Sequence, residues 1–514
     1  MVRLLVFLIP LISFLQEVTA QEAIARGRWF EVDTGNFRVF SQLSRGQSER
    51  RAAELEQWRD AAISILGSAV VPSRDPIQTY FYIFEEENVL RLFAEGGEPS
   101  YLYASPRAAF IITTDSNASL DLAQHHYSHF LINNRPIGVP RWYEEGMANY
   151  LSRLSINSGD VELRAFRDQE YEFALTLNEV LSLNALLYDD SALASPRLIQ
   201  IANLKAAMFV HFLLHGHERE GFTDRRTQLQ NYLGFLQQGR TERFAYDQAF
   251  NVPVSALERD FDRFLETSLT STDSNRSLMR AAERRNVEAV QPTPDKVTLA
   301  LAELSLHSGK FNAAEVLFGD LVNRQSTVGR AYSGFADAQR LRLREPEEME
   351  PDVVPFYMQA VAMDDSDPQL FLDYGQYLDT ELGDCERGYS VQERLRMQED
   401  MREYFGRALA LDPESPEVNL SYAQIFLMEG QDWQQGLNYQ HKAFAVMPAD
   451  SFIMEQAIKY EIAAARYDDA RTLIARLARP MHFWGTPPWI AELNNRLQAA
   501  ERGQAFDSCA ASTP

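Results

Sequence analysis

The chain contains very little cysteine. Only Cys385 and Cys509 occur among its 514 residues. Two cysteines cannot form the disulfide framework of a small secreted scaffold, and neither has neighbours typical of a catalytic cysteine. Whether the two pair is left open, because connectivity cannot be established from sequence. Hydrophobic cores must hold the fold together, and 45% hydrophobic residues suffice for two or three domains.

Positive charge is also scarce. The chain has 49 Lys and Arg against 73 Asp and Glu, a formal net charge of -24. No tract of more than three consecutive basic residues occurs. Nucleic acids and anionic membranes require a clustered basic surface, so we expect neither as a partner.

Long apolar runs are missing beyond the N-terminus. Residues 1–20, "MVRLLVFLIPLISFLQEVTA", place an Arg before an apolar run and end in small residues, which predicts a signal peptide. The run from Leu4 to Leu15 is shorter than the roughly 20 residues of a membrane span. No later segment reaches that length. We expect an exported, soluble protein, periplasmic or associated with the cell envelope, with no integral membrane segment after cleavage.

Three strand-like runs lie in the first part of the mature chain, around Phe37–Phe40, Ile77–Phe84 and Ala108–Thr113. Between the first two, apolar residues recur at helical spacing up to Gly67, which is placed to end the helix. After Ser119 the pattern turns helical. We expect an α+β domain, a small mixed sheet with helices, over residues 21–266, and a polar linker over 267–296.

An internal repeat follows the linker. The segments "QAVAMDDSDP" (359–368), "RALALDPESP" (407–416) and "KAFAVMPADS" (442–451) align at offsets of 48 and 35 residues. The shorter offset is close to the 34-residue period of tetratricopeptide repeats, which stack into helical solenoids. We therefore expect an all-α tetratricopeptide-like solenoid over 297–480, with a non-repeating helical bundle as the alternative. Residues 481–514 predict a C-terminal helix and a loose tail.

Three of the nine histidines fall in "HHYSH", residues 125–129. On a helix, His125 and His129 differ by about 40° around the axis, one turn apart, as two imidazoles on one metal ion require. His126 lies about 100° from His125 and borders the same face. The remaining histidines show no ligand spacing to this site and are expected to be structural or surface residues: His211, His215, His217, His307, His441 and His482.

Downstream, "VPRWYEEGMANYL" begins ten residues after His129, leaving room for a loop and a returning helix. The two segments together resemble the gluzincin zinc peptidases, in particular peptidase MA-like domains of exported bacterial proteins. The resemblance extends over about residues 28–266. It implies a metallopeptidase-like fold with one zinc ion held by His125, His129 and Glu145, with Glu144 the less favoured choice. It also implies that the strand Ala108–Thr113 forms a sheet edge along which a peptide can lie.

The sequence departs from the family signature, His-Glu-x-x-His, at one position: His126 stands where the family has the glutamate that acts as general base. Three interpretations follow. His126 could replace the base, since an imidazole titrates near neutral pH. It could be a further zinc ligand that closes the site. It could also be a relic beside an inert cleft.

Two classes of function stay open. One is an exported protein with an impaired peptidase site that binds peptides or proteins, its repeats recruiting protein partners. The alternative is an active zinc-dependent peptidase that uses His126 or another group as its base. The intact ligands favour the second class and the missing glutamate favours the first. Neither substrate, pathway nor oligomeric state follows from the sequence.

Overall fold

A computed structural model gives the architecture of most of the chain. It describes residues 20–67, 75–94, 96–133, 138–176, 181–190, 193, 195–269, 276–344, 348–384, 387–428, 430–479 and 488–504. The predicted signal peptide, apart from Ala20, lies outside the described residues. Cys385 and Cys509 lie outside them as well, so their pairing stays open.

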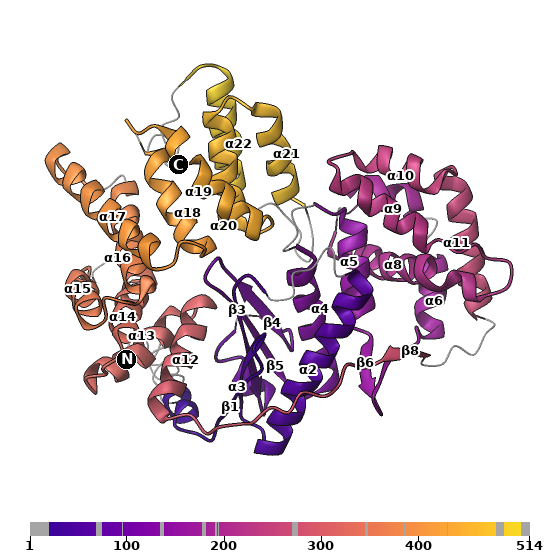
Figure 1. Ribbon diagram of the computed structural model, residues 1–514, viewed down its shortest axis with the longest axis horizontal. Helices are drawn as coiled ribbons and strands as arrows, with labels where there is room; N and C mark the ends of the chain where they lie inside the picture. Colours follow the sequence, from indigo (N-terminus) through magenta and orange to yellow (C-terminus); the bar gives the residue numbers. More distant parts are fainter. Residues whose placement is uncertain are drawn as a thin grey trace, which may run out of the picture. The chain divides into compact units, whose positions relative to one another are not determined.

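The N-terminal part contains a five-stranded mixed sheet (Figure 1). Its strands are β1 (Phe30–Asp33), β2 (Phe37–Ser41), β3 (Gln78–Phe84), β4 (Tyr101–Ala104) and β5 (Ala108–Thr114). In space they follow the order β1-β2-β3-β5-β4, with β2, β3 and β5 parallel and the two outer strands antiparallel. The three predicted strands are confirmed, and they form the centre of the sheet.

The expectation that Ala108–Thr113 forms a sheet edge is wrong. The four-residue strand β4 pairs antiparallel with β5, so β5 lies between β3 and β4. Tyr101 and Tyr103 of β4 stack on one another, with ring centroids 6.2 Å apart. A strand of four partly exposed residues is too short to show a clear alternating pattern, so sequence periodicity does not predict it. The edge of the sheet on this side is β4.

The next part of the chain is mainly helical. The helices of the described residues up to 269 include α2 (Arg45–Leu66), α3 (Glu87–Leu90), α4 (Asn117–Asn133), α5 (Arg141–Leu151), α6 (Asp168–Thr176), α7 (Leu183–Tyr188), α8 (Pro196–His215), the 3-10 helix η3 (Gly216–Glu218), α9 (Arg226–Gln237), α10 (Glu242–Phe250) and α11 (Val254–Leu269). Gly67, with φ of 92°, ends α2 as predicted. The mixed sheet with helices in the N-terminal part is therefore confirmed.

A small second sheet interrupts this helical part. It consists of β6 (Leu154–Asn157), β7 (Asp160–Leu163) and β8 (Arg276–Arg280) in the order β6-β7-β8. Ser158 and Gly159 both have positive φ and form the two-residue turn between β6 and β7. Strand β8 lies inside the segment predicted as a linker, where it pairs antiparallel with β7. The segment is rich in polar residues and the strand is partly exposed, so the sequence pattern did not indicate a strand here.

The C-terminal part is all helical among the described residues, as predicted. Its helices are α12 (Pro294–His307), α13 (Phe311–Asn323), α14 (Gly329–Leu341), α15 (Val354–Met363), α16 (Pro368–Gly383), α17 (Val391–Leu411), α18 (Pro416–Gln424), η4 (Ile425–Leu427), α19 (Trp433–Val446), α20 (Ser451–Ala463), α21 (Tyr467–Leu477) and α22 (Pro488–Glu501) (Figure 1). The predicted C-terminal helix is α22.

The internal repeat has a structural counterpart. Each of the three aligned segments ends one helix, makes a four-residue turn and starts the next helix, between α15 and α16, α17 and α18, and α19 and α20. The side chains of Asp367, Ser415 and Asp450 each accept a hydrogen bond from a backbone N–H in the first turn of the following helix. A repeated helix–turn–helix unit accounts for the repeated sequence. Whether these units form a solenoid stays a prediction.

The chain divides into two compact units, and neither is one continuous stretch. The first comprises the described parts of Met1–Ala52, Ile77–Leu120 and Asn286–Ala443. The second comprises the described parts of Ala53–Pro76, Asp121–Arg285 and Phe444–Pro514. The first unit thus joins the five-stranded sheet to α12–α18. The predicted domain boundaries concern which pieces of the chain can fold alone. They stay predictions.

One hydrophobic core connects the five-stranded sheet with α12 and α13 of the first unit. Tyr82, Phe110 and Ile112 of the sheet belong to the same buried cluster as Leu301 and Leu317 of α12 and α13. The hydroxyl of Tyr82 also donates to the backbone carbonyl of Ala300, at 2.9 Å. Burying a sheet face against a helix pair is the usual way for both elements to hide their apolar sides from water.

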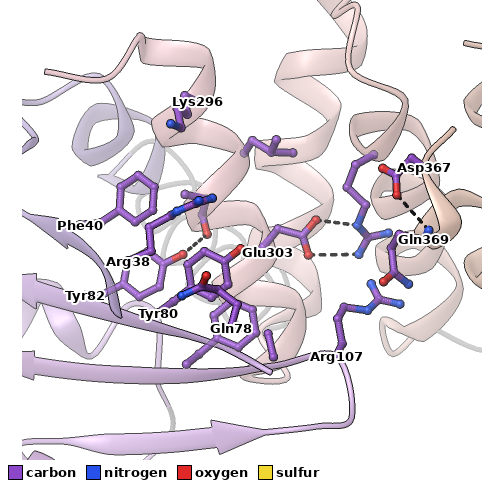
Figure 2. A pocket seen from close by; sticks show the side chains of 15 residues that line it. Arg38, Phe40, Gln78, Tyr80, Tyr82, Arg107, Lys296, Glu303, Asp367 and Gln369 are labelled. Atoms are coloured by element: carbon purple, nitrogen blue, oxygen red, sulfur yellow. Dashed lines mark hydrogen bonds and ion pairs between the residues drawn. The ribbon is translucent and has the colours of Figure 1, made fainter. Parts of the chain in front are cut away.

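A network of buried ion pairs also connects helices of the first unit with the residue that precedes β5. The guanidinium of Arg330, in α14, donates to both carboxylate oxygens of Glu303 in α12, at 2.6 and 3.1 Å, and these are the two contacts drawn from Glu303 in Figure 2. Arg330 also donates to Asp373 of α16, at 2.6 Å. Arg107, just before β5, donates to Asp373 at 2.8 Å and to Glu417 of α18 at 3.1 Å. We call Arg107, Glu303, Arg330, Asp337, Asp373 and Glu417 the arginine network.

A cavity of about 310 Å³ opens beside this network, between β2, β3, β5 and α12 (Figure 2). Its aromatic wall consists of Phe40, Tyr80, Tyr82 and Phe110. The lysine at its entrance, Lys296, forms an ion pair with Glu31. Within the lining, Glu303 and Arg330 contact one another.

One helix has the length and composition of a membrane span. Pro196–Glu218, which is α8 with η3, has a mean hydropathy of 1.3, although the sequence analysis expected no such segment. However, 67% of its apolar window is buried inside the protein. Packing within the second unit therefore explains its apolar composition, as in any core helix.

Candidate metal centre

Helix α4 carries the three histidines of the "HHYSH" segment. Ser116 starts the helix, because its hydroxyl accepts a hydrogen bond from the backbone N–H of Ser119, at 3.2 Å. The helix buries Ala123, Tyr127 and Phe130 within the protein. His125 and His129 are buried too, with 6% and 9% of their surface exposed, as two polar residues one turn apart on a core helix.

Helix α5 returns alongside and carries the glutamates. Its residue Gly146 lies against α8, where an added Cβ atom would meet the carbonyl oxygen of Ala206 at 2.6 Å and a methyl group of Val210 at 2.9 Å. Only glycine allows so close a contact. The Glu-Gly pair is thus explained: Gly146 sets the distance between α5 and α8, and this places Glu145, which is fully buried.

The structure brings His125, His129 and Glu145 together as a buried group that could hold a metal ion. The Nε2 atoms of the two histidines are 3.2 Å apart. The Oε2 atom of Glu145 lies 3.9 Å from Nε2 of His125 and 3.8 Å from Nε2 of His129. Three electron-pair donors that converge in this way from two helices can bind a cation between them.

A second glutamate contacts the far side of His129. Nδ1 of His129 lies 2.9 Å from Oε1 of Glu144, and Asn133 donates to the same oxygen at 2.5 Å. A carboxylate beside Nδ1 favours the tautomer that carries its proton on Nδ1, which would leave Nε2 free to bind a metal ion. The sequence analysis treated Glu144 as the less favoured ligand, and the structure places it as a partner of His129. Side chains at adjacent helix positions point about 100° apart, so Glu144 and Glu145 can approach the two nitrogens of one histidine.

Electrostatics differ sharply between the two glutamates. Burial raises the pKa of Glu145 to about 7, although the charges of His129 and Arg141 act against this. Burial also acts to raise the pKa of Glu144, but its hydrogen bond with His129 and the charge of that ring outweigh burial and lower it. In turn, the pKa of His129 is raised, because the hydrogen bond and the glutamate charges overcome the effect of burial.

His126 borders the group without belonging to it. Its ring centroid lies 5.8 Å from that of His125, and among the described residues the metal-capable group consists of His125, His129 and Glu145. Burial, together with the charge of His129, lowers the pKa of His126 to about 4. This lowered pKa favours the neutral form of the His126 imidazole at neutral pH.

A buried polar cluster fixes the back of α4. Arg59 of α2 donates to the hydroxyl of Tyr127 at 3.0 Å and to Asp75 at 2.8 Å, and Tyr127 donates to the other oxygen of Asp75. The indole N–H of Trp58 donates to the backbone carbonyl of Leu151, at the end of α5, at 3.1 Å. These bonds connect α2, α4 and α5 and so help to fix the positions of His125, His129 and Glu145.

Two arginines, Arg476 in the last turn of α21 and Arg479 just after that helix, lie beside the same region. Arg479 donates to the carbonyl of Val139, which precedes α5, at 3.2 Å and to Glu242 at 3.1 Å. The charge of Arg476 contributes to the lowered pKa of Glu144. Sequence reasoning missed both arginines, because more than 300 residues separate them from α5 and nothing local marks the contact.

Compared with known proteins, the chain matches no family model and no curated protein. The resemblance to the gluzincins therefore rests on the residues of α4 and α5 themselves.

Proposed function

We propose that the protein is an exported, gluzincin-like protein that binds one zinc ion through His125, His129 and Glu145. In this proposal it binds peptides or proteins rather than hydrolysing them efficiently, and its helical repeats recruit protein partners. The observation that carries the proposal is the convergence of the three side chains from α4 and α5, in the order along the chain that the gluzincin signature has.

The donor set supports zinc among the possible metals. Two imidazole nitrogens and one carboxylate oxygen are the three protein ligands of many catalytic zinc sites. Tetrahedral zinc ligands at about 2.0–2.2 Å lie about 3.3–3.6 Å from one another. The separations of 3.2, 3.8 and 3.9 Å require only small side-chain movements to reach that geometry. The contact between Glu144 and His129 supplies the outer carboxylate that zinc-binding histidines commonly have.

The weak point for catalysis is the proton acceptor. Zinc in such a site supplies a Lewis acid that polarises a peptide carbonyl and acidifies water. The chain must then supply a group that takes a proton and passes it to the leaving amine. With His126 at that position, we expect hydrolysis to be slower by about 10²- to 10⁴-fold than with a well-placed glutamate. Binding without efficient turnover is the function that this combination favours.

Metal analysis of the untagged full-length protein tests the first half of the proposal. We expect about one zinc per chain after zinc-supplemented purification, and less than a tenth of that in the His129→Ala variant. The matched control is His441→Ala, which removes an exposed histidine of α19 and should keep the zinc. Less than a tenth of a zinc per chain in the wild type would refute the metal site.

Peptide-library cleavage tests the second half. We expect little or no hydrolysis by the wild type and a clear increase in the His126→Glu variant, since a carboxylate then stands where the proton acceptor is needed. Strong zinc-dependent cleavage by the wild type that is lost in both His129→Ala and His126→Glu would overturn the proposal. That result would instead identify His126 as the base of an active peptidase.

A further inference from the structure

Helix α8 brings a residue to the candidate metal centre that the sequence analysis did not single out. This residue is Asn203, three positions before Ala206, whose carbonyl oxygen limits the approach of α5 at Gly146. Residues three apart share one face of a helix, so Asn203 lies on the side of α8 that packs against α5. The facing turn of α5 carries Arg141 and Glu145, four positions apart.

The side-chain amide of Asn203 interacts with both of these charged residues. Its Oδ1 atom accepts a hydrogen bond from the guanidinium of Arg141, a side chain that is itself buried. The amide also has a hydrogen bond with Glu145. Burial is the main cause of the raised pKa of the Glu145 carboxyl, and the hydrogen bond with Asn203 acts against it. Asn203 thus bridges two residues one turn apart on α5.

The chemistry of the two partners determines which way the amide faces. A guanidinium group can only donate hydrogen bonds, and an ionised carboxylate can only accept them. Because Oδ1 of Asn203 is used by Arg141, the NH₂ group of the same amide is left for the carboxylate of Glu145. Leucine and aspartate have a similar size, but neither offers an N–H donor. Asparagine is therefore the residue type that this position requires.

We propose that Asn203 is a positioning residue of the metal centre, whose amide N–H donates to the carboxylate of Glu145 and directs it toward the two histidines. This inference rests on the zinc site proposed above. Metal-ligating carboxylates are commonly hydrogen-bonded by such outer partners. Glu144 has the corresponding place beside His129. Two of the three ligands would then have an outer partner, one on α5 and the other on α8.

The zinc affinity of the full-length protein, measured by competition with a zinc-binding dye, tests this role. We expect Asn203→Leu to bind zinc about 10- to 100-fold more weakly than the wild type. The matched control is Gln228→Leu, in α9. The amide of Gln228 also accepts from an arginine, Arg225, at 3.0 Å, but it donates to a backbone carbonyl, that of Phe250, at 3.1 Å. Its loss should leave the zinc affinity unchanged.

A double-mutant cycle separates positioning from a general loss of structure. If Asn203 acts through the carboxylate of Glu145, Asn203→Leu should weaken zinc binding no further in a Glu145→Gln background, whereas independent effects would add. Circular dichroism reports folding. If Asn203→Leu does not fold, Asn203→Ala removes the amide without adding a branched side chain and should weaken zinc binding in the same way.

The outcomes distinguish this inference from the zinc site on which it rests. A wild type that binds no zinc would overturn the proposed zinc site, and the role of Asn203 with it. A wild type that binds zinc would leave the zinc site standing, and three results would then overturn the role of Asn203 alone. These are unchanged affinity in Asn203→Leu, an equal loss in Gln228→Leu, and additive losses in the double variant.

Discussion

The metal centre and the arginine network are both buried groups of polar side chains, but they are balanced in different ways. In the arginine network every carboxylate contacts a guanidinium of the chain itself. The single guanidinium of Arg330 contacts three of them, Glu303, Asp337 and Asp373. In the metal centre the histidine nitrogens and the Glu145 carboxylate converge on one another, 3.2 to 3.9 Å apart. The chain completes the first group, whereas a cation from solution would complete the second.

This difference distinguishes a charge cluster that the chain itself completes from one that could hold a metal ion. A buried ion pair needs good geometry and further hydrogen bonds to offset the cost of removing its charges from water. The arginine network meets that requirement with residues of four helices of the first unit and Arg107, which precedes β5. A group that gathers electron-pair donors around one point lowers its free energy when a metal ion binds. The predictions below test this contrast, from the largest expected effect to the smallest.

Loss of Arg330 should produce the largest change. The Arg330→Gln variant leaves Glu303, Asp337 and Asp373 buried without their shared guanidinium, and we expect the free energy of unfolding to fall by about 3–5 kcal/mol. Arg324→Gln is the control, because Arg324 is 41% exposed and pairs with Asp295 and Asp320 at the surface, where pairs contribute about 0–1 kcal/mol. Urea denaturation measures both. Equal effects of the two substitutions would show that the network does not stabilise the fold.

Zinc should stabilise the protein through the other cluster. A ligand that binds only the folded state at 1,000 times its Kd raises the free energy of unfolding by about 4.1 kcal/mol. We expect thermal unfolding to shift upward with zinc in the wild type and in Arg330→Gln, and to shift back with a chelator. The His129→Ala variant should show no shift. Stabilisation of that variant by zinc would place the binding site elsewhere.

Two glycine-to-alanine substitutions test the distance between α5 and α8 at the candidate metal centre. In Gly146→Ala the new methyl group meets Ala206 and Val210 of α8, so we expect a loss of about 1–3 kcal/mol in stability together with weaker zinc binding. In Gly234→Ala, on α9, a Cβ atom meets nothing within 4 Å, and helix propensity should raise stability by about 0.5–1 kcal/mol. Effects of the same sign in denaturation experiments would contradict the role assigned to Gly146.

The smallest change concerns the outer carboxylate. In Glu144→Gln the hydrogen bond that orients His129 becomes neutral, and loss of such a partner typically weakens metal affinity by about 10- to 100-fold. Competition with a zinc-binding dye measures that affinity. Glu172→Gln, an exposed glutamate of α6, should leave it unchanged. Complete loss of zinc in Glu144→Gln would mean that Glu144 is itself a ligand.

Much of the metal centre could be predicted from sequence, because its parts are local. The spacing of His125 and His129 places them one turn apart on any helix, and Glu145 follows within one helical hairpin. The central strands and the helical repeats were also predictable from their apolar periodicity. Strands β4 and β8 were missed because short, partly exposed segments form strands only when a neighbour offers its edge.

The sequence by itself determined which side chains could bind a metal and that a histidine replaces the expected base, since both depend on residue identity and helical spacing. Only the tertiary structure decided that β4 covers β5, that Arg107 joins Asp373 across 266 residues, and that Glu144 orients His129. It alone brought Asn203 of α8 into contact with Arg141 of α5. The physical reason is the same in each case: contacts distant in sequence depend on how whole surfaces pack, and no local pattern encodes that packing.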